Sequence, residues 1–220
     1  MLATPEAATV LAPSLEAVML FPFGNPDQLA ELAEVLDAVV IGPSAGLDHG
    51  TIANLEALQT TGAALVVDAD ALSIFKGRPD ALFALLDRDD VITPHEGEFE
   101  RLFPGLLSEG RPAAAAEAAR RTGCVVVLKG AETLIATPDG RMRRNPNGSP
   151  WLATAGSGDV LAGMIGGLMA QSMPSFEAAS AGVWLHAAVG RAFGPGLRAE
   201  DLPDGLPAQL RLLCDMPDAG

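Results

Sequence analysis

The chain has 220 residues, of which 49% are hydrophobic and 19% are charged, which is enough apolar material for a packed core and excludes a disordered chain. Its 14 basic and 28 acidic residues give a net charge of −14. That charge argues against nucleic acid and against an anionic membrane surface as partners, because both are negatively charged themselves.

Short apolar runs alternate with helical patterns from residue 38 onwards. In chain order we expect a strand at 38–41, a helix at 51–61, a strand at 64–68, a helix at 79–86, a strand at 91–92 and helices at 96–103 and 112–121. The strongest strand, 124–129, is followed by a hairpin of 133–136 and 141–143 around the turn Pro138-Asp139-Gly140. Two long apolar helices at 157–171 and 175–193 come next, and one further helix closes the tail after Gly194.

Fully apolar strands separated by helices indicate an α/β fold, in which a mostly parallel sheet is covered on both faces. We expect a single domain, since no repeat or linker divides the chain. The longest apolar stretch, 160–170, is too short to cross a bilayer. The chain opens without a basic leader, and its two cysteines, Cys124 and Cys214, form no Cys-x-x-Cys pair. These features predict a cytoplasmic protein.

Ligands of such sheets bind beyond the carboxyl ends of the strands, and the strongest signal there is Gly156-Ser157-Gly158-Asp159. Its two glycines flank Ser157 just before an apolar helix, where free backbone N–H groups can hold an anion. Asp159 would face that anion, which suggests a base for an attacking hydroxyl or a neighbour of magnesium. The alternative is an ordinary helix start, with Ser157 or Asp159 as the cap.

Two strand ends carry more specific candidate residues. Lys129 follows the strongest strand and is one of two lysines in an arginine-rich chain, which suggests that the compact positive charge of a lysine is needed at this position; the alternative is a lysine that reaches into solvent. His95 lies between a strand and a helix, where it can reach a ligand while its backbone caps the helix. The acids at 96, 98 and 100 have the simpler explanation of a favourable helix start. We interpret His186, inside the long helix 175–193, as a packed residue.

The remaining two strand ends are less specific. The glycines of Gly42-Pro43-Ser44-Ala45-Gly46 could line a pocket or simply turn the chain. Asp68 could orient a ligand, and we expect Asp70 to cap the next helix. The spacing of His and carboxylate residues indicates no structural metal site.

Taken together and in order, these motifs resemble the NAD(P)H-hydrate dehydratases of the ribokinase-like superfamily. The resemblance covers nearly the whole chain, and its motifs are Gly42-Pro43…Gly46, Val67-Asp68-Ala69-Asp70-Ala71-Leu72, Thr93-Pro94-His95-Glu96-Gly97-Glu98, Leu128-Lys129-Gly130-Ala131-x-Thr133 and Asn145-x-x-Gly148…Ala153-Thr154-Ala155-Gly156-Ser157-Gly158-Asp159. It implies a ribokinase-like fold and a hydro-lyase that repairs hydrated NADH and NADPH. Phosphoryl transfer from ADP, or from ATP in other members, turns the C6 hydroxyl of the S epimer into a leaving group. The products with ADP are NAD(P)H, AMP and phosphate.

The resemblance also implies residue roles. Asp159 would be the catalytic base and, with Gly46 and His95, a substrate contact. The anion hole would be Gly156, Ser157 and Gly158. The nucleotide would be held by Lys129, Gly130, Ala131, Glu132, Thr133 and Gly158. Mg²⁺ would bridge the phosphates without a dedicated set of protein ligands. The resemblance further implies a homotetramer that works with an NAD(P)H-hydrate epimerase.

The sequence departs from the family pattern in three places. Gly42-Pro43-Ser44-Ala45-Gly46 replaces a commoner Gly-Pro-Gly-Leu-Gly, and Asn147 and Ser149 replace a Thr and an Asn. The basic, Gly-rich opening strand and its helix have no counterpart here, so we expect a domain, 1–220, that is truncated at its N-terminus relative to the family. Two alternatives remain open at this point: a related kinase acting on a small alcohol such as a vitamin precursor, and a truncated nucleotide-binding remnant without activity.

Overall fold

A six-stranded sheet forms the centre of the molecule in this computed structural model, which describes residues 1–214. The strands are β3 (Ala38–Ile41), β4 (Ala64–Val67), β5 (Val91–Ile92), β6 (Val125–Leu128), β7 (Thr133–Ala136) and β8 (Met142–Asn145). They lie side by side in sequence order, with β3 to β6 parallel and β7 and β8 antiparallel. The mostly parallel sheet and the terminal hairpin were both predicted from the sequence, and both are confirmed.

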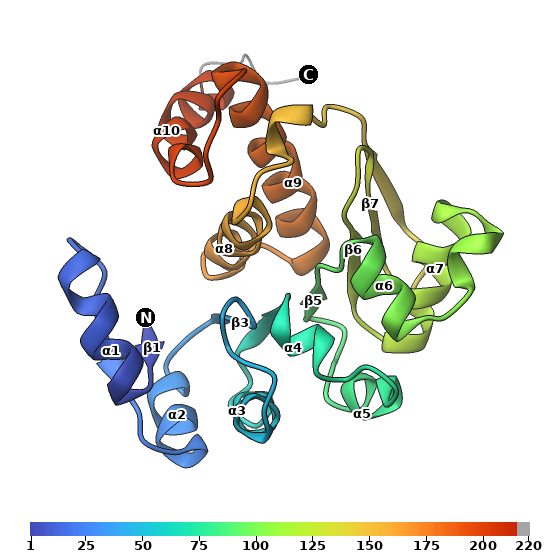
Figure 1. Cartoon of the computed structure of the whole chain (residues 1–220). Coiled ribbons are helices and arrows are strands. Elements are labelled where there is room, and N and C mark those ends of the chain that lie inside the picture. Colours follow the sequence, from blue (N-terminus) through green and yellow to red (C-terminus); the bar gives the residue numbers. More distant parts are fainter. Residues whose placement is uncertain (215–220) are drawn as a thin grey trace.

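Helices cover both faces of this sheet, as the apolar strands predicted (Figure 1). The core on one face is formed with α3 (His49–Gln59), α4 (Asp70–Ser73), α5 (Pro79–Phe83), α6 (Glu96–Leu102) and α7 (Arg111–Thr122). The core on the other face is formed with α8 (Ser157–Met169) and α9 (Ser175–Phe193). Within β4, Val67 belongs to the first core and Val66 to the second, because successive side chains of a strand point to opposite faces.

The helices begin and end close to the predicted positions. α7 has Pro112 in its first turn and ends at Gly123, whose φ of 74° is the left-handed conformation that closes many helices. α5 ends at Phe83, three residues earlier than expected. The predicted tail helix is α10 (Asp201–Cys214), which packs on α9 and buries Leu202. Residues 215–220 of the predicted domain lie outside the described part of the chain.

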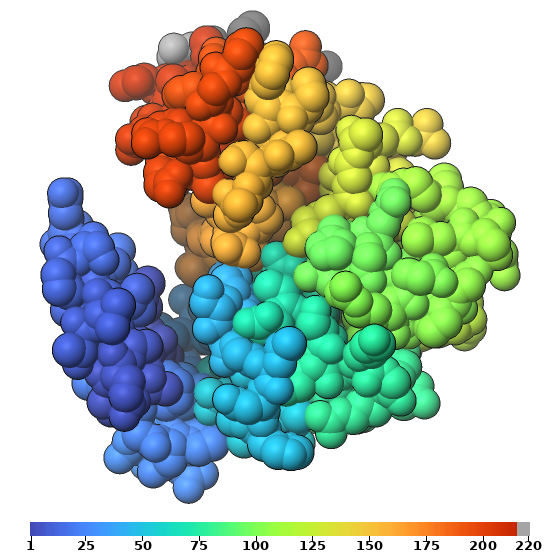
Figure 2. Space-filling view, viewed as in Figure 1, coloured from blue at the N-terminus to red at the C-terminus, as the bar shows by residue number. Residues whose placement is uncertain are grey.

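The first 37 residues contain elements that the sequence patterns did not reveal. They are β1 (Leu2–Ala3), α1 (Pro5–Leu11), the 3-10 turn η1 (Ala12–Ser14), β2 (Phe21–Pro22) and α2 (Pro26–Ala33). β1 and β2 pair in parallel as a separate two-stranded sheet, and α1 buries none of its residues. Figure 2 shows this segment in blue at one side of the molecule. The two strands have only two residues each and α1 buries none of its residues, so these elements give no clear periodic signal; α2 buries Leu29 and Ala33, four positions apart, and its signal was missed.

Two short 3-10 turns complete the fold, η2 (Leu106–Glu109) before α7 and η3 (Pro150–Leu152) before α8. Within residues 1–214, none of the helices combines the length and the hydropathy that crossing a bilayer would need.

Candidate active site

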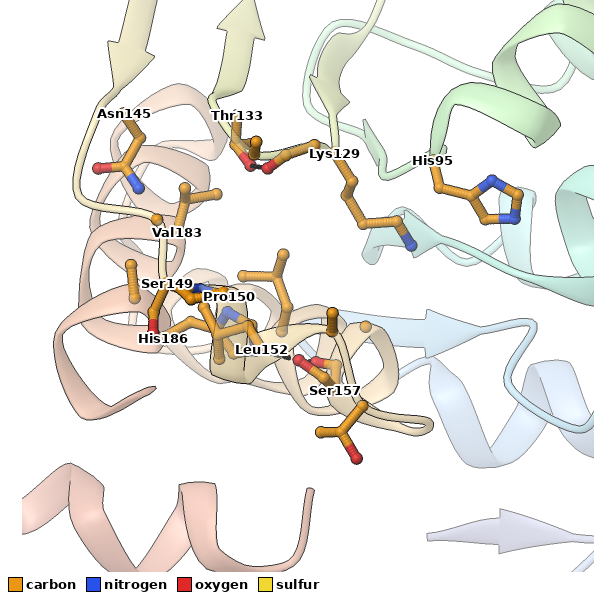
Figure 3. A pocket seen from close by; sticks show the side chains of 18 of the residues that line it. His95, Lys129, Thr133, Asn145, Ser149, Pro150, Leu152, Ser157, Val183 and His186 are labelled. Atoms are coloured by element: carbon orange, nitrogen blue, oxygen red, sulfur yellow. Dashed lines mark hydrogen bonds between the residues drawn. The ribbon is translucent and has the colours of Figure 1, made fainter. Parts of the chain in front are cut away.

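A cavity of about 840 Å³ opens at the carboxyl ends of the strands, between the loops that follow β5, β6 and β8 and the start of α8 (Figure 3). Of the residues predicted for the site, those that line it are His95, Lys129, Gly130, Ala131, Thr133, Ser157 and Gly158. The lining does not include Gly46, Glu132, Gly156 or Asp159. Residues that are far apart in the sequence therefore meet where the rule for parallel sheets predicted.

The start of α8 leaves backbone donors free. Gly156 precedes the helix with a φ of 80°, and no side chain of residues 1–214 caps this end, so the alternative of a Ser or Asp cap is wrong. The Ser157 N–H is bonded to the carbonyl of Thr154, whereas the N–H groups of Gly158 and Asp159 have no acceptor among residues 1–214. Two free donors at the positive end of a helix can hold an anion.

The Lys129 ammonium group lies close to this turn. Its Nζ donates to both carboxylate oxygens of Asp68, at 2.8 and 3.0 Å. The Asp68 side chain is 1% exposed and that of Lys129 is 17% exposed, so this is a buried ion pair and not a lysine in solvent. A methyl group added to Gly158 would lie 3.2 Å from the same Nζ. The ammonium group is thus held beside the free N–H groups, where a phosphate would meet both.

Asp159 lies in the first turn of α8 and is exposed. Partial burial of its carboxyl group raises the pKa of Asp159, the negative charge of Asp68 adds to that rise, and Lys129 opposes it. A carboxylate whose pKa lies above its ordinary value is a better proton acceptor than a typical surface aspartate.

The His95 ring caps the N-terminus of α6. Its Nδ1 accepts the N–H groups of Gly97 at 2.9 Å and Glu98 at 3.4 Å, and the Glu98 carboxylate accepts the His95 N–H at 2.9 Å. We expected the backbone of His95 to provide the cap; the side chain does so instead, in a capping box. Because Nδ1 is an acceptor, the proton of the neutral ring is on Nε2. Burial of Glu98 raises the pKa of its carboxyl group.

Gly46 and Asp70 are joined to each other near this end of the sheet. The Gly46 N–H donates to Oδ2 of Asp70 at 3.0 Å, so Asp70 holds the loop after β3. The expectation that Asp70 caps the next helix is wrong: α4 follows Ala69, which has a φ of 50°, and no side chain bonds to its N-terminus. Gly42 of the same loop has a φ of 127°, and a methyl group there would lie 1.7 Å from the Asp68 carbonyl oxygen. This close approach explains why position 42 requires a glycine.

Arg111 is a supporting residue that the sequence reasoning missed. It forms an ion pair with Glu96, and its Nη2 donates to the carbonyl of Glu132 at 2.9 Å and to that of Leu128 at 3.3 Å. It therefore joins the start of α6 to the end of β6 and to the loop after it. A signal existed in the sequence, because a cation in the first turn of a helix is electrostatically unfavourable and calls for a partner elsewhere.

His186 is the second residue that was missed. The prediction that it packs inside its helix is confirmed, since it is 7% exposed, but it also lines the cavity. Its Nε2 lies 3.0 Å from Oγ of Ser157 and 2.9 Å from the Ser157 carbonyl oxygen. Burial lowers the pKa of His186 to about 4, so the ring is neutral near pH 7.

Comparison with known proteins shows the family of this chain. Residues 1–205 match the family described as NAD(P)H-hydrate dehydratase. The chain belongs to this family. A relative from Gloeobacter violaceus, a bifunctional NAD(P)H-hydrate repair enzyme, is 41% identical over 93% of the chain and 42% of its own length. The corresponding enzyme of Moorella thermoacetica is 40% identical over 96% of the chain and 41% of its length. The chain thus spans less than half the length of these curated relatives.

Solved structures confirm the ribokinase-like fold of this family member. The ADP/ATP-dependent NAD(P)H-hydrate dehydratase of Bacillus subtilis, co-crystallised with ATP and Mg²⁺ and soaked with CoA, is 28% identical and superposes with a TM-score of 0.79 over 94% of this chain and 78% of that one. A ribokinase-like superfamily protein of Enterococcus faecalis gives 0.82 at 25% identity, over 96% and 75% of the two chains.

Proposed function

We propose that this dehydratase-family chain restores NADH and NADPH from the S epimer of their hydrated forms, using ADP as phosphoryl donor and releasing AMP and phosphate. The observation that carries the proposal is that Lys129 and the free N–H groups at the start of α8 meet at one end of the cavity, with the Asp159 carboxyl group in the same helical turn and close enough to Lys129 for their charges to interact. Family membership and the similarity to a dehydratase of known nucleotide dependence support it.

In this proposal Asp159 accepts the proton of the C6 hydroxyl as that oxygen attacks the terminal phosphorus of ADP. The oxygen–phosphorus bond forms and the bond to AMP breaks. The electrons of the ring nitrogen then expel phosphate from C6, and loss of a proton from C5 to water gives the C5–C6 double bond of NAD(P)H. The raised pKa of Asp159 suits a general base. Lys129 and the N–H groups of Gly158 and Asp159 stabilise the negative charge of the phosphoryl group during transfer.

The nucleotide would lie along the loop after β6. The residues proposed to hold it are Lys129, Gly130, Ala131, Glu132, Thr133 and Gly158. Glu132 contributes its backbone, which Arg111 already binds. The methyl group that Gly130 lacks would lie 2.5 Å from Arg111, so a larger residue here would displace the support of the loop. On the substrate side we propose contacts from His95, which lines the cavity, and from Asp159 and Gly46, which lie outside its lining and would act at its rim.

Mg²⁺ fits this site as a companion of the phosphates. It prefers oxygen ligands and commonly binds through one or two carboxylates together with substrate phosphates and water. Among residues 1–214, no three His, Cys, Asp or Glu side chains gather as metal ligands, while Asp159 offers one carboxylate beside the phosphate-binding turn. Bound there, Mg²⁺ would neutralise phosphate charge.

The test is the recovery of reduced-nicotinamide absorbance from hydrated NADH with ADP and Mg²⁺. We expect turnover by the wild-type chain and a loss of at least about 100-fold in Asp159→Asn. Asp80→Asn is the matched control, because Asp80 is an exposed carboxylate in the first turn of another helix, α5. No recovery with either ADP or ATP would refute the proposal, and a stable phosphorylated product from a small alcohol would favour the kinase alternative.

Three further properties are proposed from the family resemblance. We propose that the chain acts in the cytoplasm, that it assembles as a homotetramer, and that an NAD(P)H-hydrate epimerase supplies its S-epimer substrate. Sedimentation of the purified chain tests the assembly. The epimerase link predicts that a mixture of the two epimers is only partly repaired until an epimerase is added.

A further inference from the structure

The contact between α8 and α9 beside the cavity is polar, in a region where these helices otherwise pack through apolar side chains. Leu161, Ile165 and Val183 belong to one apolar cluster. His186 and Ser157 are also buried, at 7% and 4% exposure, yet they meet through the two short contacts of Nε2 with Oγ and with the carbonyl oxygen of Ser157. A buried polar contact of this kind places its atoms more narrowly than apolar packing does.

The geometry decides which ring nitrogen carries the proton. A carbonyl oxygen is only an acceptor, so an unprotonated Nε2 placed 2.9 Å from it would bring two lone pairs together. Nε2 is therefore protonated and donates to the carbonyl oxygen, with Oγ as a second acceptor at 3.0 Å. Because Nε2 cannot accept, the hydroxyl hydrogen of Ser157 does not bond to His186. Among residues 1–214, Ser157 Oγ has no other hydrogen-bond partner.

We propose that His186 is a positioning residue that turns the Ser157 hydroxyl into a donor directed at a phosphate oxygen of the bound nucleotide. Ser157 lines the cavity between Gly156 and Gly158, so its hydroxyl hydrogen joins the free N–H groups of the turn and the Lys129 ammonium as a third kind of donor. His186 itself does not touch the nucleotide in this arrangement; it acts only through Ser157. The inference rests on the proposed function in one respect, the presence of a phosphate at this turn.

The surroundings of His186 favour a neutral imidazole near pH 7. Its pKa is lowered to about 4, mainly by burial and in smaller part by the nearby Lys129 charge. A neutral ring with its proton on Nε2 has one N–H and one fixed direction of donation. That N–H donates to the Ser157 carbonyl oxygen, so the Ser157 hydroxyl has no acceptor on His186 and must donate its hydrogen to another group.

Calorimetric titration of the whole chain with two probes tests this role. ADP carries phosphates and adenosine carries none, so a phosphate-directed donor affects only ADP. We expect His186→Leu to weaken ADP binding about 10-fold, the usual size for a hydrogen bond to a charged group, and to leave adenosine binding unchanged. His186→Gln, whose amide N–H can donate to the same carbonyl, is the conservative control and should retain most of the affinity for ADP.

Ser157→Ala provides a second route that does not depend on the stability of a His186 variant. It should weaken ADP about 10-fold and spare adenosine, and Ser157→Ala combined with His186→Leu should bind ADP no more weakly than Ser157→Ala alone. Equal losses for both probes, additive losses in the double variant, or unchanged ADP affinity in Ser157→Ala would each overturn the proposal. A wild-type chain that binds no ADP would overturn it as well, whereas ADP binding without repair of hydrated NADH would contradict only the proposed function.

Discussion

Acidification should destabilise this protein through His186. The folded chain holds the pKa of His186 at about 4, against an ordinary value of 6.5. Between these values the unfolded chain binds one more proton than the folded chain, so the free energy of unfolding falls as the pH is lowered. The difference between the two pKa values corresponds to a total loss of about 3.4 kcal/mol in the free energy of unfolding at low pH. About 2 kcal/mol of this loss occurs between pH 7 and about pH 5.

Urea unfolding at these two pH values measures the effect, with His186→Gln as the variant that cannot titrate. The wild-type chain should lose about 2 kcal/mol more than the variant. Other groups are common to both proteins and cancel in this difference. One of them is Asp90, whose pKa burial raises to about 7, and which therefore favours the folded state as the pH falls. Equal pH dependence of the two proteins would refute the reasoning, because it would mean that the imidazole is not buried in its neutral form.

The remaining predictions concern the charges and backbone near the cavity. Lys129→Met should lower the free energy of unfolding by about 3 kcal/mol, because it leaves the buried Asp68 carboxylate unpaired. Adding Asp68→Asn should restore most of that stability. Urea unfolding curves that show no such rescue would contradict the buried ion pair. In the same assay Gly42→Ala should lower the free energy of unfolding by more than about 3 kcal/mol, because the added methyl group clashes with the Asp68 carbonyl. Gly140→Ala is the control. Gly140 also has a positive φ, of 90°, but no atom of residues 1–214 lies within 4 Å of the added methyl group, so this variant should lose only about 1 kcal/mol through backbone strain. Arg111→Gln should raise the KM for ADP about tenfold by releasing the loop after β6, and an unchanged KM would show that this loop needs no support.

Much of the fold follows from local patterns. The strands β3, β4 and β6 could be predicted because each is an uninterrupted apolar run, and such runs occur where helices cover both faces of a sheet. The hairpin of β7 and β8 was visible from its turn residues. The N-terminal segment was not predicted. Within it α1 buries none of its residues and gives no pattern to detect, whereas α2 buries Leu29 and Ala33 on one face and could have been found.

The candidate site divides in the same way. Asp159, Lys129 and His95 stood out because each is a reactive residue type at the end of a strand or the start of a helix. The partners that orient them did not stand out. The ion pair of Lys129 joins residues 61 positions apart, and the bond between Ser157 and His186 spans 29 positions.

By itself, the sequence determined the α/β class, the order of most elements, the family and the positions at which ligands were to be sought. These depend on periodicity, glycine placement and motif order, all of which are local properties of the chain. Only the tertiary structure decided that Lys129 is half of a buried ion pair, that Asp70 holds a loop instead of capping a helix, and that His186 contacts Ser157 at the start of α8. The physical reason is that a hydrogen bond or an ion pair depends on distances of about 3 Å between side chains, and for residues far apart in the chain those distances exist only after the sheet and its helices have packed.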